Sequence, residues 1–178
     1  MNTNGLDLQT LSVGLLIARV IIGLLMAAHG TQKLFGWFGG YGLNATGEFM
    51  VQLGFNPGRA FAAAASLGEI TSGLLVALGL LGPIGPALMV SVMIVATITV
   101  HWKNGLWASN NGFELPLLYS TAAIGLALTG FGAYSLDAML NIAGRWTTTV
   151  TWIVLALGVL GGLGNLALRH RPATRAGA

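Results

Sequence analysis

The chain has 178 residues, of which 54% are hydrophobic and only 7% charged, and its net charge is +3. Soluble domains carry about a quarter charged residues, so this composition cannot cover a solvated surface and excludes a soluble fold. Three of the eight basic residues, Arg169, Arg171 and Arg175, lie in the last ten positions. They are typical of a membrane topology anchor, so no nucleic-acid partner is expected. The absence of cysteine excludes disulfides and thiol redox chemistry by the chain itself.

Five apolar stretches follow one another along the chain, each close to the roughly 20 residues that a membrane-spanning helix needs. They are Leu11 to Ala28, Ala60 to Leu81, Ile84 to Trp102, Leu115 to Gly132 and Thr148 to Leu168. We therefore predict an all-α fold, namely a transmembrane four-helix bundle plus a fifth C-terminal membrane helix, with the lipid bilayer as its surroundings. Residues 1–137 would form the four-helix domain, including an interfacial loop at 34–58. Residues 138–178 would add the last helix and a basic cytoplasmic tail.

Lysine and arginine in short loops mark the cytoplasmic side of a membrane protein. Counted over alternating loops, one side would hold Lys33, Arg59, Lys103, Arg169, Arg171 and Arg175. The opposite side would hold only Arg145. The pattern predicts a multi-pass protein with its N-terminus outside and its C-terminus in the cytoplasm.

Two ionisable residues, Arg19 and Glu69, lie inside apolar stretches, where a charge is unfavourable by about 2.5 to 3.5 kcal/mol on insertion scales. Arg19 lies ten residues before His29, at the expected end of the first helix. Glu69 lies ten residues after Arg59, at the expected start of the second. Because these helices would be antiparallel, both side chains would lie about 15 Å below the same surface. We predict that they form a buried ion pair, either as a structural clasp or as the floor of a functional cavity.

More titratable side chains are expected above this pair, at the cytoplasmic ends of four helices. His29 and Lys33 are spaced one helical turn apart, His101 ends the third stretch, and Glu114 begins the fourth. All four are ligand-binding candidates for one shared cavity. Lipid headgroups or backbone groups could satisfy the histidines instead, and a helix dipole could favour Glu114. Together with Glu69 these residues have ligand types that suit non-haem iron, but Lys33 would repel a cation, so no metal is predicted.

Residues 35–42 are rich in glycine and aromatic side chains, yet they follow no strand and fit no phosphate-binding fingerprint. We expect this loop to form an interfacial lid over the cavity, with Trp37 as a further ligand-binding candidate. Residues 44–53 would follow as a short amphipathic helix on the membrane surface, presenting Phe49, Met50 and Leu53 to it.

Gly158 and Gly162 have the spacing of small residues that lets two membrane helices approach closely. A homo-oligomer formed through these glycines is one expectation for the last stretch. Simple packing of this face against lipid is the other, because glycine is common throughout the chain.

Several motifs together resemble the DoxX family of bacterial membrane proteins: residues 29–40 (HGTQKLFGWFGG), residues 52–55 (QLGF), the helix around Glu69 and residues 112–114 (GFE). The resemblance extends over about Leu11 to Asp137. The family is similar to the DoxD-type subunit of thiosulfate:quinone oxidoreductase, and some members are associated with membrane complexes that handle oxidative and thiol stress. The resemblance thus implies a bacterial plasma-membrane protein with a quinone-linked or redox-partner role. The family's usual unit is four membrane helices, so the fifth stretch departs from it.

Two functions are consistent with these features. In the first, the chain is the membrane subunit of a redox system, a quinone-linked oxidoreductase, and works with a redox protein partner. His29, Lys33 and His101 would donate hydrogen bonds to a quinone near the cytoplasmic interface, and Glu69 and Glu114 would relay protons. In the second, the chain is a non-catalytic scaffold that recruits a soluble redox or stress-response enzyme through its basic and aromatic loops. A channel is the least favoured, because the outer halves of the second and third stretches are almost wholly apolar.

Overall fold

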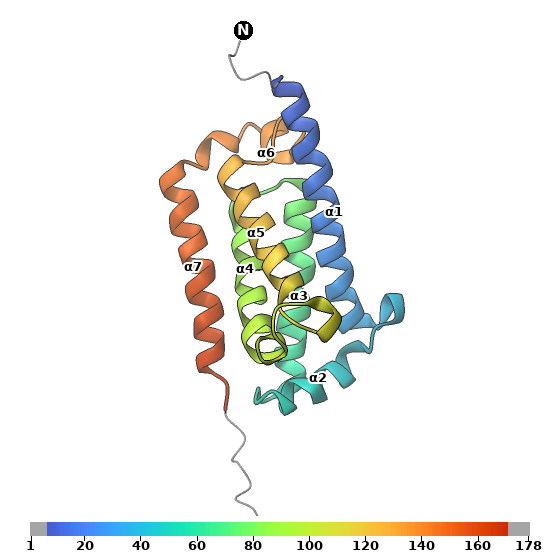
Figure 1. Cartoon of the computed structure of the whole chain (residues 1–178). Helices are drawn as coiled ribbons and strands as arrows, with labels where there is room; N and C mark the ends of the chain where they lie inside the picture. The colour runs from blue at the N-terminus through green and yellow to red at the C-terminus, as the bar shows by residue number, and fades with distance from the viewer. Residues whose placement is uncertain (1–6, 171–178) are drawn as a thin grey trace, which may run out of the picture.

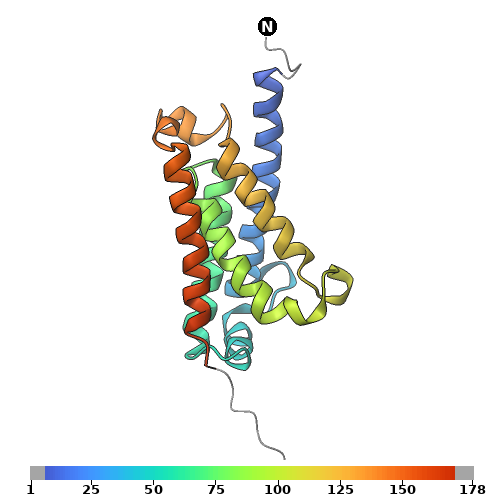
Figure 2. The ribbon, with the colours of Figure 1, turned by 60° about the vertical axis from the view of Figure 1, so that its left-hand side comes forward.

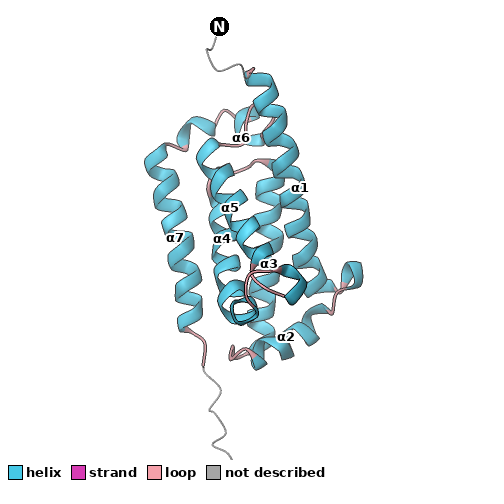
Figure 3. Ribbon diagram, viewed as in Figure 1, coloured by secondary structure: helices cyan, strands magenta, loops and turns pink. Residues whose placement is uncertain are grey.

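The computed structural model describes residues 7–170, and within this range every regular element is helical, which confirms the all-α prediction (Figure 3). The α-helices in it are α1 (Leu8–Phe35), α2 (Gly42–Gln52), α3 (Gly58–Leu78), α4 (Ile84–Ala96), α5 (Glu114–Thr129), α6 (Leu136–Met139) and α7 (Thr148–Ala167). The five long helices form an elongated bundle, with α6 at one end and α2 at the other (Figure 1). We call these the α6 end and the α2 end. Arg171 and Arg175 of the predicted tail lie outside the described residues.

Among the described residues, four helices are long and apolar enough to cross a membrane: α1, α3, α7, and α4 with its continuation to Asn104. The helix α5 is apolar but has only 16 residues. At helical rise it measures about 24 Å, which is less than the roughly 30 Å of a hydrocarbon core. It ends at Thr129 rather than at the predicted Gly132, because Gly130 has a φ of 74° that turns the chain out of the helix.

The first helix is longer than the apolar stretch that predicts it. It begins after Asp7, whose carboxylate accepts the backbone N–H of Gln9, and it ends at Phe35 before Gly36. Gly36 has a φ of 75°, the left-handed conformation that commonly ends a helix. The helix thus extends almost two turns beyond the predicted apolar stretch, which ends at Ala28, and it includes His29 and Lys33 at the predicted helical spacing. The residues after Ala28 are polar, but polarity does not stop a helix unless a glycine or proline accompanies it at a suitable place.

α1 and α3 pack along each other through glycines that leave no side chain between the two backbones. A Cβ atom placed on Gly23 would lie 2.5 Å from the carbonyl oxygen of Gly73 and equally close to the backbone nitrogen of Ala77. Nearer the α2 end, Gly30 lies against the backbone of Ser66. Small residues allow this close approach in membrane helices. The contacts also fix how far each helix is shifted along the other.

α7 packs against α4 in the same way, as its position beside α4 in two views indicates (Figure 2). A Cβ atom on Gly158 would lie 2.5 Å from the carbonyl oxygen of Ala87, and one on Gly162 would lie 2.8 Å from that of Ser91. Both glycines thus face a helix of their own chain. The expected homo-oligomer contact through Gly158 and Gly162 is wrong, and so is the alternative in which this face meets lipid.

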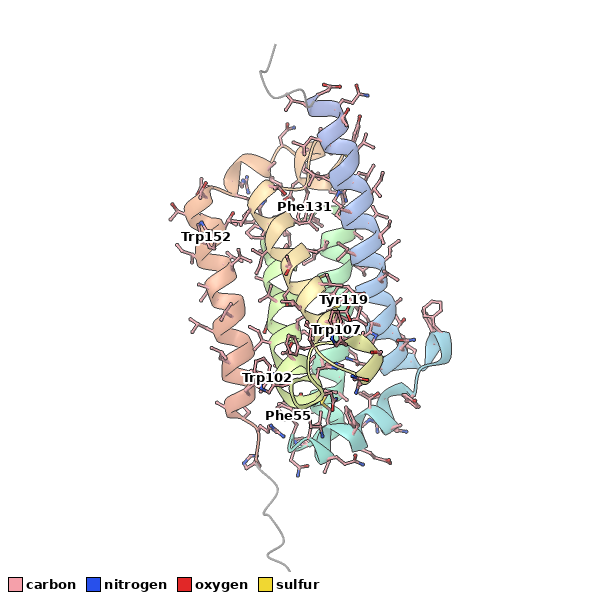
Figure 4. All side chains as sticks on the ribbon, in the orientation of Figure 1. Phe55, Trp102, Trp107, Tyr119, Phe131 and Trp152 are labelled. Atoms are coloured by element: carbon pink, nitrogen blue, oxygen red, sulfur yellow. The ribbon has the colours of Figure 1, made fainter. Side chains whose placement is uncertain are left out.

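The hydrophobic core lies between these helices and contains Met26, Val76, Met89, Leu126 and Phe131. Phe131 lies near the α6 end, whereas Phe55 lies near the α2 end (Figure 4). Phe55 is also fully buried, and it packs against Phe61 at the start of α3. Large side chains on the outer faces of α1, α5 and α7 are exposed, as expected for helices that meet lipid.

We predict that Gly23→Ala lowers the free energy of unfolding by about 1 to 3 kcal/mol, because the added methyl group has no room against α3. Gly14→Ala is the matched control. Gly14 lies on the same helix as Gly23, but a Cβ atom at Gly14 would have no neighbouring atom within 4 Å. Chemical denaturation of both purified variants in detergent measures the difference. Equal stability of the two variants would contradict the close packing of α1 on α3.

Candidate functional site

Glu69, in the middle of α3, is completely buried and forms an ion pair with Lys33. The Nζ atom of Lys33 donates to Oε1 of Glu69 at 2.5 Å. Lys33 lies in the last turn of α1 and reaches Glu69 because α1 continues past Ala28. Opposite charges in direct contact offset part of the cost of taking each out of water.

Arg19 is buried too, but it does not contact Glu69. Its guanidinium donates to the carbonyl oxygen of Ala77, near the end of α3, and to that of Tyr134 at 2.7 Å, just before α6. Arg19 thus joins α1 to α3 and to the loop that leads into α6. The predicted Arg19–Glu69 ion pair is wrong, although both residues are buried as expected.

The glycine contacts explain why these partners differ from the predicted ones. Gly23 lies opposite Ala77, so Arg19, one turn earlier on α1, reaches the end of α3. Glu69 lies close in sequence to Ser66, which is opposite Gly30, and Gly30 is one turn from Lys33. Arg19 and Lys33 lie on one face of α1 but about 21 Å apart at helical rise.

The Lys33–Glu69 pair lines a cavity of about 250 Å³ at the α2 end. Its walls come from α2, α3, α4 and α7, and they are mainly apolar. Just beyond α4 the wall includes Thr99, which belongs to a π-helical turn (Thr97–His101) that continues the helix. Such turns often occur at functional sites. Asn165 of α7 adds a polar group to the opposite side.

α2 covers this cavity in place of the aromatic loop. Phe49, Met50 and Leu53, which are expected to pack against the membrane surface, also line the cavity beside Lys33, while Phe49 remains 43% exposed. The hydroxyl of Thr46 lies 3.3 Å from the carbonyl oxygen of Lys33 and so joins α2 to the end of α1. It also lies 2.7 Å from the carbonyl oxygen of Gly42 within α2. The cavity beside Glu69 is therefore covered by the helix that follows residues 35–42, whereas Gly39, Gly40 and Tyr41 of the loop line a different cavity.

A second cavity, of about 490 Å³, lies on the other side of Lys33. His29, Gln32 and Tyr41 line it, together with exposed residues of α2. Lys33 and Thr46 belong to the walls of both cavities. His29 and Lys33 are thus brought together as predicted, in this second cavity.

Comparison with known protein families supports the resemblance noted in the sequence. The DoxX family model matches residues 14–102, which is half of the chain. The chain belongs to the DoxX family. No curated protein and no solved structure matches it. The matched segment includes Lys33, Glu69, α2 and the π-helical turn, so most of the cavity wall belongs to the DoxX part of the chain, whereas α5, α6 and α7 follow it.

The other predicted ligand-binding residues of this DoxX protein lie elsewhere. The Nδ1 atom of His101 is 2.8 Å from the carbonyl oxygen of Asn111, and Glu114 accepts the backbone N–H of Ala108. Both therefore shape the segment between α4 and α5. Trp37 is 57% exposed and packs against Phe35, outside both cavities. Within residues 7–170, no three His, Asp or Glu side chains lie close enough together to hold a metal ion.

Asp137 is a buried carboxylate that the sequence analysis missed. One oxygen accepts the backbone N–H of Leu81, and the other accepts the N–H of Gly82 and the indole N–H of Trp146. These bonds tie α6 to the turn between α3 and α4. No pattern signals this role, since two of the donors are backbone groups. An acidic residue in a segment with few charges was the only available hint.

We predict that Lys33→Met lowers the free energy of unfolding by about 3 to 5 kcal/mol, because it leaves the Glu69 carboxylate buried and unpaired. Adding Glu69→Leu to this variant should restore part of the loss. Arg19→Met also destabilises the fold, but its effect should simply add to that of Glu69→Leu, since the two residues share no contact. Denaturation of the single and double variants in detergent gives both coupling energies. A stronger coupling of Glu69 to Arg19 than to Lys33 would refute the observed pairing.

Proposed function

We propose that this chain is an integral membrane subunit of a redox system and binds a quinone in the 250 Å³ cavity beside Lys33. The observation that carries the proposal is a charged, hydrogen-bonding pair in the wall of an otherwise apolar cavity covered by α2. Ligand sites commonly combine apolar walls with a few placed polar groups in this way. The cavity is slightly smaller than the usual range of roughly 300 to 1,000 Å³, which suits a single-ring head group rather than a larger ligand.

The residues present suit the two parts of a quinone. The ammonium of Lys33 has three N–H donors, and only one is bonded to Glu69, so another can bond a ring carbonyl. Phe49, Phe55 and Phe61 provide apolar contact for a ring. Phe49 and Leu88, which also line the cavity, are partly exposed, so a hydrocarbon tail can leave toward the lipid. A quinone would supply the redox chemistry, while the chain would bind and orient it.

The proposed setting is a bilayer crossed by the four long apolar helices and also by α5, with the α2 end facing the cytoplasm. Exposed aromatic residues at the α2 end, Trp37 and Trp102 among them, suit the headgroup layer, where indoles are favoured. The basic residues counted on this side support the same orientation. Since the chain has no cysteine, we propose that a redox protein partner exchanges electrons with the bound quinone.

One observation favours the alternative function of a non-catalytic scaffold. The segment between α4 and α5 projects from the bundle (Figure 2) and exposes Trp102, Leu106 and Trp107. Such residues are common in protein interfaces, so this segment could recruit a soluble redox or stress-response enzyme. In that case the chain would bind no quinone, and changes in this segment would release the partner.

We predict that Ala65→Phe weakens quinone binding by about tenfold or more, because the added ring occupies part of the cavity. Leu67→Phe is the matched control, since Leu67 lies on the same helix but is 53% exposed outside the cavity. A spectral titration with a short-chain benzoquinone, on protein in lipid nanodiscs, measures the affinity. Absence of quinone binding by the unmodified chain would refute the proposal and favour the scaffold.

A further inference from the structure

One oxygen of Glu69 has no hydrogen-bond partner in the described part of the chain. Lys33 bonds Oε1, while Oε2 is fully buried and unpaired among residues 7–170. Buried polar atoms are nearly always satisfied, and an unpaired carboxylate oxygen is costly in apolar surroundings. Glu69 also lines the 250 Å³ cavity, so its side chain lies beside the space that a ligand would occupy.

An ionised carboxylate accepts hydrogen bonds and cannot donate them. A ligand that pairs with Oε2 must therefore supply a donor. A quinone has only acceptors on its ring oxygens, whereas the reduced hydroquinone has two hydroxyl groups. We infer that the cavity binds the hydroquinone form more tightly than the quinone form, through a hydroxyl that donates to Oε2 of Glu69. This inference rests on the proposed function and adds the preferred redox state of the ligand.

A neutral donor fits this site better than a cation. The negative charge of Glu69 is already balanced by Lys33 at 2.5 Å, so a second positive charge would be repelled by the ammonium. The rest of the cavity wall is mainly apolar, and its polar side chains, Thr46, Ser91, Thr99 and Asn165, are all neutral and bring no negative charge to balance an added cation. A hydroxyl group can bond to Oε2 without bringing any net charge into the cavity.

The cavity wall also favours a ring over an aliphatic alcohol. The rings of Phe55 and Phe61 lie with centroids 5.1 Å apart and tilted by 37°, and Phe49 lines the cavity from α2. Aromatic groups in such arrangements gain energy from ring-to-ring contacts in addition to burial. A hydroxyl-bearing lipid without a ring would form the same hydrogen bond but lose these contacts.

The experiment compares four probes for binding to the full-length protein in nanodiscs under anaerobic conditions. The probes are a short-chain alkyl benzohydroquinone, the matching benzoquinone, the dimethyl ether of the hydroquinone, and an aliphatic alcohol of similar size. We expect the hydroquinone to bind about tenfold more tightly than the quinone and the ether, because only it donates to a charged acceptor. The alcohol should bind more weakly than the hydroquinone.

The variant Glu69→Gln tests whether the carboxylate of Glu69 causes the preference for the hydroquinone. The amide of glutamine can donate to a quinone carbonyl, so the variant should lose or reverse the preference for the hydroquinone. Glu114→Gln makes the same chemical change outside the cavity and should retain the preference. If Glu69→Gln fails to fold, the affinities of the four probes for the unmodified protein still test whether the cavity prefers the hydroquinone.

The possible results separate this inference from the proposed function. Equal or tighter binding of the quinone or the ether would overturn the inference and leave quinone binding in place. Equal binding of the alcohol would assign the site to hydroxylated lipids and overturn the hydroquinone assignment. Binding of no ring compound would overturn the proposed function and the inference together.

Discussion

The ion pair between Lys33 and Glu69 is the interaction on which the α2 end of this molecule depends. Glu69 is completely buried, where its charge would be costly without a partner, whereas the side chain of Lys33 is 26% exposed. The pair can form only if α1 continues to its last turn and if α3 is shifted along it to the right extent. The glycine contacts at Gly23, Gly30 and Gly73 fix that shift. Close backbone packing and charge pairing therefore specify the same arrangement of the two helices.

The position of α2 follows from the same interaction. Thr46 lies within reach of the backbone of Lys33, and Gly47 packs on the backbone at Arg59, so α2 is fixed between the end of α1 and the start of α3. This places its apolar face over the carboxylate of Glu69 and separates the two cavities at the side chain of Lys33. An amphipathic helix that could have rested on a membrane surface instead closes a site within the protein.

The sequence predicted the long helices well because the thickness of a bilayer imposes a local requirement on apolar length. It also identified Arg19, Lys33 and Glu69 as residues that need partners. It could not choose between Arg19 and Lys33 as the partner of Glu69, because both lie on one face of α1 and the choice depends on where that helix ends. Polar residues after Ala28 concealed this end. The role of Asp137 was not predictable, since two of its three donors are backbone groups without a sequence signature.

The two ends of the bundle use buried charges differently. At the α6 end, both terminal nitrogens of Arg19 bond backbone carbonyls, and both oxygens of Asp137 have donors. These charges connect segments of the chain, although the buried Nε of Arg19 has no partner among residues 7–170 and Asp137 lines a cavity of about 440 Å³. At the α2 end, Glu69 keeps one oxygen unpaired among the described residues and faces a cavity. α7 lies outside the matched DoxX segment but adds Asn165 to this wall, and the backbone N–H of His170 bonds the carbonyl of Gly54 just after α2. The C-terminal helix thus completes the cavity around a charge pair that the family segment supplies.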